Sequence, residues 1–431
     1  MPWDFETEPK FQEQLDWITQ FVREEVAPLD FVFDHYNDFS DPNRAILVPP
    51  LQSEVKRRGL WACHLDPELG GQGFGQLKLA LMNEILGQAF MAPVVFGCQA
   101  PDSGNAEILA RYGTAEQKER YLEPLLNNEI ASCYSMTEPQ GGADPKVFTC
   151  RATRVGNEWL INGEKWFSSN ARYASFLIVM AVTDPEEPPS RRMSMFIVPA
   201  DTPGIEIVRN VTAGMERSGG HHAYMRYRDV RIPADHLLGE QGRGFAVAQT
   251  RLGGGRIHHA MRTVGKVKLA FDMMCERALS RTTQGERLAD KQMVQAMVAD
   301  SWLEIEQFRL LLLRTAWRID RHNDYAAVRG DISAIKALMP RVYHDVYARA
   351  IQIHGSLGVS NELPLGAGLL DAFHMGLADG PTEVHKVALA KSVFAGYQPT
   401  VELFPEYSLV KRREAAIAKY AGMLEVEIAD L

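Results

Sequence analysis

Two clusters of aromatic and hydroxyl residues could contact a flat or anionic ligand, and the first spans residues 133–144. It reads Cys-Tyr-Ser-Met-Thr-Glu-Pro-Gln-Gly-Gly-Ala-Asp, and Tyr134 and Met136 alternate with hydroxyl residues as in a strand. Pro139 ends the strand, and the pair Gly141-Gly142 lets the backbone come close to a bound group. N–H groups exposed at a glycine turn suit carbonyl or phosphate oxygens. The alternative is a strand that runs into an ordinary surface loop.

The second cluster, Gly163-Glu-Lys-Trp-Phe-Ser-Ser-Asn170, closes another strand-like run. Together the two clusters resemble the flavin-binding middle domain of the acyl-CoA dehydrogenase family. The family's Met-Thr-Glu-Pro motif matches residues 136–139, and its Lys-x-Trp-x-Thr-Asn motif is similar to residues 165–170. The resemblance covers about residues 5–395. It implies an FAD-dependent acyl-CoA dehydrogenase.

By this resemblance, a set of residues around the two clusters holds FAD. The protein supplies orientation and hydrogen bonds, while the flavin ring performs the redox chemistry. Phe167 replaces the family's usual Trp, and Ser169 replaces the Thr whose hydroxyl approaches flavin N5. Gly142 and Ala143 would offer backbone N–H groups to the pyrophosphate, and Ala143 lacks the hydroxyl of the family's usual Ser. The other expected contacts, with Thr137 hydrogen-bonded to the ring, are Tyr134, Met136, Thr137 and Ser168.

Two further segments resemble the family's contacts to the FAD of a neighbouring subunit. Arg281 is followed by Gln292 eleven residues later, and the planar fork of an arginine can bind phosphate bidentately. Gln352, Gly355 and Ser356 belong to a segment similar to the family's Gln-x-x-Gly-Gly-x-Gly. Without the resemblance, these residues would be a helix-terminal arginine and a glycine-capped helix. The resemblance implies a homo-oligomer, a dimer or tetramer, with shared FAD sites.

Asp379 is the candidate catalytic base. Desaturation of an acyl thioester removes an α proton while a hydride leaves the β carbon, and a carboxylate in a dry pocket suits the first task. Asp379 stands where the family usually has Glu, and its surroundings resemble the branch of family members ten and eleven. The aspartate is shorter by one methylene, roughly 1.5 Å. The alternative is an N-cap for a helix that begins at Pro381.

Other residues are expected beside the base or the cofactor. By resemblance, Arg256 lies near the thioester end of CoA, Gly380 contacts the substrate, and Glu383 falls where the family often has a Gln near the flavin. The alternative for Arg256 is a helix-surface arginine. The pairs His221-His222 and His258-His259 suggest a metal site, but adjacent residues on a strand or helix point apart. We therefore expect no metal.

The pattern of the chain changes three times, which indicates how these motifs are positioned. Helical spacing predicts helices in residues 1–130, and short runs between Gly, Pro and Asn turns predict an antiparallel barrel or sandwich in residues 131–240. Helical spacing returns in residues 241–396, and a charged helical tail occupies residues 397–431. Segregated elements favour an α+β chain of three domains. The resemblance implies the same order: an N-terminal helical domain, a middle antiparallel β domain and a C-terminal four-helix bundle.

Some elements carry sharper signals. We expect a buried strand at residues 176–182, a long helix at 244–280 and a tail helix at 411–425. Gly113-Thr114 combines a C-cap glycine with an N-cap for the next helix. The glycine-rich loop 69–75 lacks the spacing of a dinucleotide motif. It is either a flexible loop between helices or, by resemblance, part of the acyl pocket.

Composition and charge exclude several classes of protein. The chain of 431 residues has a net charge of −9, so it lacks the basic surface expected of a nucleic-acid-binding protein. No apolar run reaches membrane-spanning length, and the acidic first residues lack the features of a secretion or transit signal. The five cysteines form no Cys-x-x-Cys pair, which favours reduced thiols. We expect a cytoplasmic protein without a membrane span.

The expected reaction takes two hydrogens from an acyl-CoA and passes electrons to an electron-transfer flavoprotein. One alternative is an oxidase or monooxygenase on the same scaffold, similar to nitroalkane oxidase, which also uses an aspartate base. A second is a non-catalytic flavoprotein similar to the DNA-associated alkylation-response branch. The negative charge and the retained Asp379 argue against the second alternative. The length of the acyl chain stays open.

Overall fold

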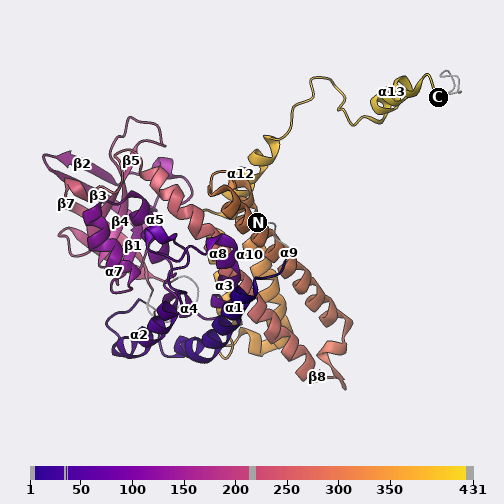
Figure 1. Ribbon diagram of the computed structural model, residues 1–431, viewed down its shortest axis with the longest axis horizontal. Coiled ribbons are helices and arrows are strands. Elements are labelled where there is room, and N and C mark those ends of the chain that lie inside the picture. The colour runs from indigo at the N-terminus through magenta and orange to yellow at the C-terminus, as the bar shows by residue number, and fades with distance from the viewer. Residues whose placement is uncertain (1–4, 34, 36, 213–219, 424–431) are drawn as a thin grey trace.

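Helices, a β sheet and a second group of helices follow one another in the computed structural model, which describes residues 5–33, 35, 37–212 and 220–423 (Figure 1). This order confirms the predicted α+β fold. The predicted domain limits at residues 130, 240 and 396 stay a prediction. The N-terminal helices are α1 (Pro9–Phe21), α2 (Pro42–Arg57), α3 (Gly75–Leu86), α4 (Ala92–Val95), α5 (Asp102–Tyr112), α6 (Ala115–Gln117) and α7 (Glu123–Leu126).

Local sequence signals explain where these helices begin and what they bury. In α1, Phe11, Leu15 and Ile18 recur at helical spacing and are all buried. At the start of α6, Gln117 N–H donates to Thr114 Oγ1 at 3.2 Å, and Thr114 N–H donates to Gln117 Oε1 at 3.1 Å. This reciprocal pair is a capping box and confirms the predicted N-cap.

The sheet has seven strands, and its central strand β4 (Phe176–Val182) is buried at every position, as its continuous apolar run predicts. The strands lie in the order β1-β4-β2-β3-β7-β6, β5 pairs with β4, and β1 also pairs with β3. Most pairs are antiparallel as predicted, but β4 runs parallel to β1 and β2 because long connections separate these strands. The other strands are β1 (Ser132–Ser135), β2 (Arg151–Val155), β3 (Glu158–Ser169), β5 (Met193–Pro199), β6 (Ile205–Val211) and β7 (His222–Pro233).

The C-terminal helices pack around α10 (Arg329–His354), which contacts α8 (Gly244–Ser280), α9 (Gln292–His322), α11 (Leu365–Leu377) and α12 (Thr382–Phe394). The bounds of α8 agree with the predicted helix at 244–280. A short hairpin, β8 (Thr282–Thr283) and β9 (Glu286–Arg287), joins α8 to α9. The N-terminal helices share one apolar core with this bundle, so the helical regions enclose the space between them.

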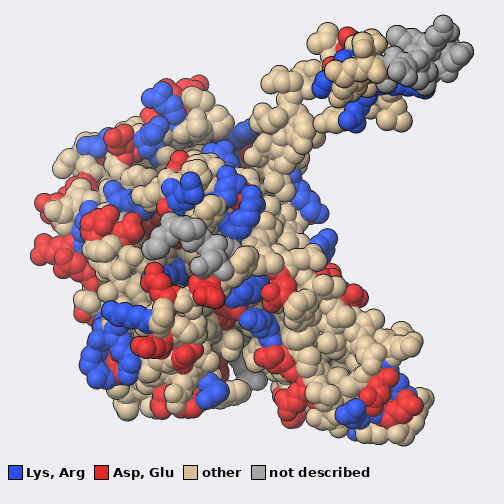
Figure 2. Space-filling view, turned by 45° about the vertical axis from the view of Figure 1, so that its right-hand side comes forward, with Lys and Arg blue, Asp and Glu red and all other residues tan. Residues whose placement is uncertain are grey.

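The tail helix α13 (Leu409–Tyr420) extends away from the rest of the chain (Figure 1). It is shorter than the helix predicted at 411–425, and positions 424 and 425 lie outside the described residues. The face shown in Figure 2 has interspersed acidic and basic side chains over the N-terminal and β regions, with broad uncharged areas on the helical bundle. Among the described residues, no helix is long and apolar enough to cross a membrane.

Candidate active site

A buried ion pair joins the two sequence clusters. Lys165 Nζ lies 2.9 Å from Glu138 Oε1, and both side chains are at most 1% exposed. The same ammonium donates to the carbonyl oxygen of Met136 at 2.8 Å. Glu138 also accepts from the N–H groups of Thr149 and Cys150. Burial raises the pKa of Glu138, but Lys165 and these donors lower it by more than burial raises it. The carboxylate is therefore ionised, and it fixes the loop after β1 against β3.

The two clusters therefore form one surface. Tyr134 on β1 lies opposite Ser169 on β3, and Trp166 N–H donates to the carbonyl oxygen of Thr137 at 2.8 Å. Phe167 is 41% exposed and has a φ of +52°, a left-handed conformation that is unusual for a bulky residue. This strained backbone turns an aromatic ring outward beside the hydroxyl groups.

Ser168 and Ser169 point to different sides. Ser168 is fully buried, and its Oγ lies 2.8 Å from Ser135 Oγ inside the sheet. This placement argues against the predicted cofactor contact of the Ser168 side chain. Ser169 Oγ is instead 2.8 Å from Nδ1 of His222, whose ring is 5.3 Å from that of Phe167.

These residues fit the flavin ring of FAD. An exposed phenyl ring, the half-buried hydroxyls of Thr137 and Ser169, and the nearby backbone provide the flat wall and polar edge that such a ring needs. Gly142 and Ala143 are exposed on the adjoining loop, and a Cβ atom built at Gly142 would meet nothing within 4 Å. Their N–H groups are therefore open to a phosphate.

Asp379 lies between α11 and α12, with a φ of +57°. Helix α12 starts at Thr382 with Pro381 as its N-cap and no side-chain cap, so the alternative role of Asp379 as an N-cap is excluded. The side chain is half-buried, with 17% of its surface exposed, and its Oδ2 lies 3.6 Å from Nε2 of His259 on α8. Arg256 Nε donates to the backbone carbonyl oxygen of Asp379 at 2.9 Å, so this predicted site residue touches the candidate base.

Positive charges surround Asp379. Burial raises its pKa, but His259, Arg251, Lys336 and Arg256 lower it more, and the net shift is downward. Burial lowers the pKa of His259 to about 3, so this imidazole is neutral near pH 7. At that pH the positive charges that act on the Asp379 carboxylate are those of Arg251, Lys336 and Arg256. Burial also lowers the pKa of Lys336, to about 8, which leaves its ammonium mostly charged. The aspartate is therefore an ionised, half-buried carboxylate.

Glycines of α8 give the acidic side chains room. A Cβ atom at Gly255 would lie 3.2 Å from Asp379 Oδ2, and one at Gly254 would lie 2.8 Å from Glu107 Oε2. Asp379, Gly255 and Glu107 line a cavity of about 40 Å³ together with Arg251 and other residues of α5 and α8. A helix without these glycines would exclude the carboxylates from the cavity.

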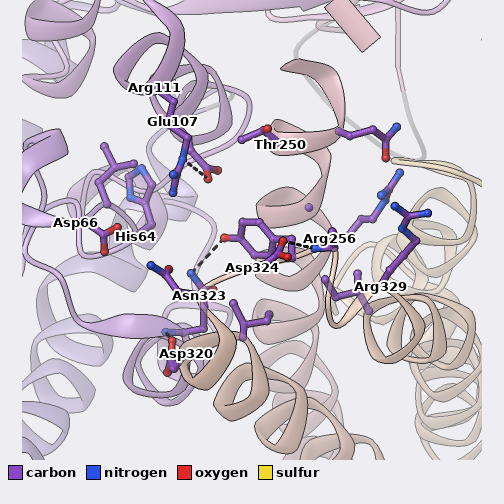
Figure 3. A pocket seen from close by; sticks show the side chains of 18 of the residues that line it. His64, Asp66, Glu107, Arg111, Thr250, Arg256, Asp320, Asn323, Asp324 and Arg329 are labelled. Carbon is purple, nitrogen blue, oxygen red and sulfur yellow. Dashed lines mark hydrogen bonds and ion pairs between the residues drawn. The ribbon is translucent and has the colours of Figure 1, made fainter. Parts of the chain in front are cut away.

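A larger cavity of about 460 Å³ lies beyond Arg256, between the N-terminal helices and the bundle (Figure 3). Figure 3 shows Glu107 and Arg111 from α5 on one side and Arg256 and Arg329 from α8 and α10 on the other. Burial raises the pKa of Glu107 to about 7. Gly75 also lines this space, so the glycine-rich loop forms part of a pocket wall rather than a free loop. Arg256, which lines this cavity, also contacts the backbone of Asp379.

The remaining predicted residues lie elsewhere. Gly380 has a φ of +104° and packs next to His385, whereas Glu383 is exposed in the first turn of α12. Helix α8 is about 55 Å long from its 37 residues. Its first residue, Gly244, packs against the sheet, and the hairpin at its other end lies far from the strands (Figure 1). The antiparallel helices bring to that distant end Arg281, Gln292, Gln352, Gly355 and Ser356.

The structure adds residues that the sequence did not reveal. Arg251 lies five positions before Arg256 in the same helix, and Lys336 is a lone lysine among the apolar positions of α10, which was a usable signal. The expectation that His221 and His222 point apart is wrong, because their ring centroids are 4.1 Å apart. His221 precedes β7, so strand alternation does not apply to it.

Comparison with known proteins identifies the family. Family models of the N-terminal, middle and C-terminal domains of acyl-CoA dehydrogenases match residues 8–129, 133–230 and 242–394. The chain is 39% identical to the Mycobacterium tuberculosis protein named probable acyl-CoA dehydrogenase FadE2, covering 90% of this chain and 96% of that protein. It is 38% identical to rat acyl-CoA dehydrogenase family member 11 and to mouse member 10, but spans only 50% and 37% of their lengths.

Solved structures agree with the sequence relatives. A Mycobacterium abscessus structure is 38% identical and superposes with a TM-score of 0.84, covering 91% of this chain and 100% of that one. Butyryl-CoA dehydrogenase from Megasphaera elsdenii is 26% identical with a TM-score of 0.77, at the same coverage. The match to the M. tuberculosis relative extends over nearly the whole of both chains. The chain therefore belongs to the acyl-CoA dehydrogenase family.

Proposed function

We propose that this chain desaturates an acyl-CoA thioester between Cα and Cβ, with Asp379 as the base that takes the α proton. Family membership supports the predicted enzyme class and its cofactor, FAD. The observation that carries the proposal is the ionised, half-buried carboxylate of Asp379, which lies beside Arg256 and faces a cavity instead of capping α12. The product would be the 2-enoyl-CoA.

Each part of the site has a task in this reaction. The 460 Å³ cavity would admit the CoA arm, and Arg256 would direct the thioester towards the base. Asp379 accepts the α proton from a substrate that enters the cavity lined by its carboxylate. FAD, when bound against Phe167 and Ser169, supplies the acceptor for the hydride that leaves Cβ. Electrons would then pass to an electron-transfer flavoprotein.

The geometry also supports a shared cofactor site. Arg281 directly precedes β8 and Gln292 starts α9 just after the hairpin, and β8 lies far from β1 and β3 of the same chain (Figure 1). Residues such as Met293 and Trp302 of α9 are 77% and 54% exposed, which leaves apolar surface for a second copy. We therefore propose a homo-oligomer in which Arg281 and Gln352 contact the neighbour's FAD.

Flavin reduction under anaerobic conditions tests the proposal. A panel of acyl-CoAs of different length is mixed with the FAD-loaded enzyme, and loss of flavin absorbance is followed by stopped flow. Asp379→Asn should slow reduction by a factor of about 10²–10⁴, the usual contribution of a general base. Asp371→Asn removes another carboxylate on α11 that does not line the cavity, and should retain reduction.

Two results would contradict the proposal. If Asp379→Asn is reduced as fast as the parent enzyme, Asp379 is not the base. If no acyl-CoA reduces the flavin but small nitroalkanes do, and peroxide forms in air, the enzyme is an oxidase of the kind considered above.

A further inference from the structure

A chain of buried hydrogen bonds ends at Arg251. Asp102, which is 3% exposed, accepts from the backbone N–H and the hydroxyl of Ser132 at 2.8 and 2.6 Å. Ser132 Oγ accepts from Asn105 Nδ2 at 2.8 Å, and Asn105 Oδ1 accepts from Arg251 Nε at 2.9 Å. Both Ser132 and Asn105 are fully buried. A buried polar chain of this kind destabilises the fold unless every donor and acceptor in it has a hydrogen-bond partner.

The first residue of the chain fixes the direction of every bond. Asp102 acts only as an acceptor, since Asn37 and Gln99 also donate to it. The Ser132 hydroxyl therefore donates to Asp102 and must accept from the Asn105 amide. The amide then has to turn its oxygen towards Arg251, which always donates. Asp102 thus determines the orientation of the Asn105 amide, which is two hydrogen bonds away and supplies the acceptor for Arg251.

A second contact fixes the plane of the guanidinium. Its central carbon lies 3.8 Å from the centroid of the Tyr134 ring, within the range of a cation–π interaction. The one hydrogen bond that Arg251 makes to a described residue uses Nε. The Nη groups therefore have no acceptor in the part of the chain that the structure describes, and Arg251 lines the 40 Å³ cavity together with Asp379.

We propose that Arg251 is a positioning residue for Asp379, held by the Asp102–Ser132–Asn105 chain at a fixed place from which it keeps the carboxylate ionised and directed into the cavity. This inference rests on the proposed role of Asp379 as the base. The pKa of Asp379 agrees with it, because Arg251 follows only burial and His259 among the influences on that carboxyl. The titratable and charged groups that face Asp379 or its cavity are Tyr134 (β1), Glu107 (α5), Arg251, Arg256, His258, His259 and Arg262 (α8), Lys336 (α10) and His385 (α12).

The pH dependence of flavin reduction separates positioning from a structural role. Arg251→Met keeps an apolar stem over Tyr134 but removes a cation, so the acid limb of the profile should move to higher pH by about 0.5–1 unit. Arg262→Met is the matched control, because Arg262 lines the same cavity on the same helix but is not among the leading causes of the Asp379 shift. Its acid limb should match that of the parent. If the acid limbs of Arg251→Met and Arg262→Met lie at the same pH, the inference is overturned.

Two further variants test the hydrogen-bond chain itself. Arg251→Lys restores the charge without the planar fork, so the acid limb should return towards the parent while the rate stays low. Asn105→Ala leaves Arg251 in place but removes its Nε acceptor, and should move the limb in the same direction as Arg251→Met, by less. An Asn105→Ala limb equal to that of the parent would refute the positioning chain, even if Arg251→Met does not fold.

A measurement without turnover keeps this inference separate from the proposed function. Urea unfolding of the flavin-free parent, Arg251→Met, Asp379→Asn and the double variant should give non-additive midpoints, because two interacting charges are removed. Additive midpoints would refute the interaction whatever the enzyme does. Conversely, rapid flavin reduction by Asp379→Asn would refute the role of Asp379 as the base, but it would not affect the coupling between Arg251 and Asp379 that urea unfolding measures.

Discussion

The ion pair between Lys165 and Glu138 gives the sharpest test of how the flavin surface is held together. In Lys165→Met, the Glu138 carboxylate would stay buried without a cation. It would keep hydrogen bonds from the N–H and hydroxyl of Thr149, the N–H of Cys150 and the side-chain amide of Gln140. Breaking one partner of a buried pair costs about 3–5 kcal/mol. These four remaining hydrogen bonds place the expected loss near the lower end, at about 3 kcal/mol. Because Lys165 also holds the carbonyl oxygen of Met136, FAD affinity should fall as well.

Urea unfolding of the flavin-free protein, followed by tryptophan fluorescence, measures this loss, and a titration with FAD measures the affinity. The control is Lys291→Met, which removes a lysine from a pair with Glu286 whose side chains are 29% and 60% exposed. Exposed pairs contribute only about 0–1 kcal/mol. Equal losses in the two variants would refute the role of burial.

Urea unfolding at different pH values tests the direction in which the stability difference between the parent and Lys165→Met changes with pH. The pKa of Glu138 is lowered in the folded protein, so its ionised form contributes stability above its unfolded pKa, and this contribution is lost as the pH falls. The difference between the parent and Lys165→Met should therefore be largest near pH 7 and shrink towards pH 4. A difference that grows on acidification would contradict the assignment.

Three further predictions follow from single contacts. Burial raises the pKa of Asp371, but Lys266 at 2.6 Å and His374 together lower it by more. In urea unfolding, Asp371→Asn should therefore lose about 1–2 kcal/mol near pH 7 and approach the parent below pH 4; the loss is modest because Lys266 is 36% exposed. Gly255→Ala should stabilise α8 by as much as about 1 kcal/mol, because alanine favours a helix more than glycine does. It should also slow flavin reduction, because the added Cβ atom crowds Asp379; an unchanged rate would contradict this. Asp320→Ala should lower the free energy of unfolding by about 1–2 kcal/mol in urea, because its carboxylate accepts from the N–H groups of Gln76 and Leu77 in the first turn of α3. Asp320→Asn should lose less.

Elements with a local signal could be predicted from the sequence. The run 176–182 is apolar throughout, and a strand inside a sheet covered on both faces requires this. Helix 244–280 has a regular apolar spacing that sets its length. The parallel pairing of β4 had no such signal, because the register of distant strands depends on packing.

The candidate site was predictable in part for the same reason. Thr137 and Phe167 belong to contiguous motifs, and Asp379 stands in a recognisable one. Arg251 and Lys336 join Asp379 only because α8 packs against α10 and the loop before α12 folds back over both. No spacing in the sequence encodes that approach. The outward-facing ring of Phe167 likewise depends on a left-handed backbone that a strand pattern does not predict.

The glycine run 253–255 in α8 has a consequence for dynamics. Each glycine inside a helix costs about 1 kcal/mol relative to alanine, so this turn has little tendency of its own to stay wound. It is braced by Tyr325, Glu107 and Asp379, which pack against the glycines from other elements. When a substrate fills the cavities beside it, the amide protons of this turn should exchange more slowly with deuterium. The helix would then report occupancy of the pocket before any bond to hydrogen is broken.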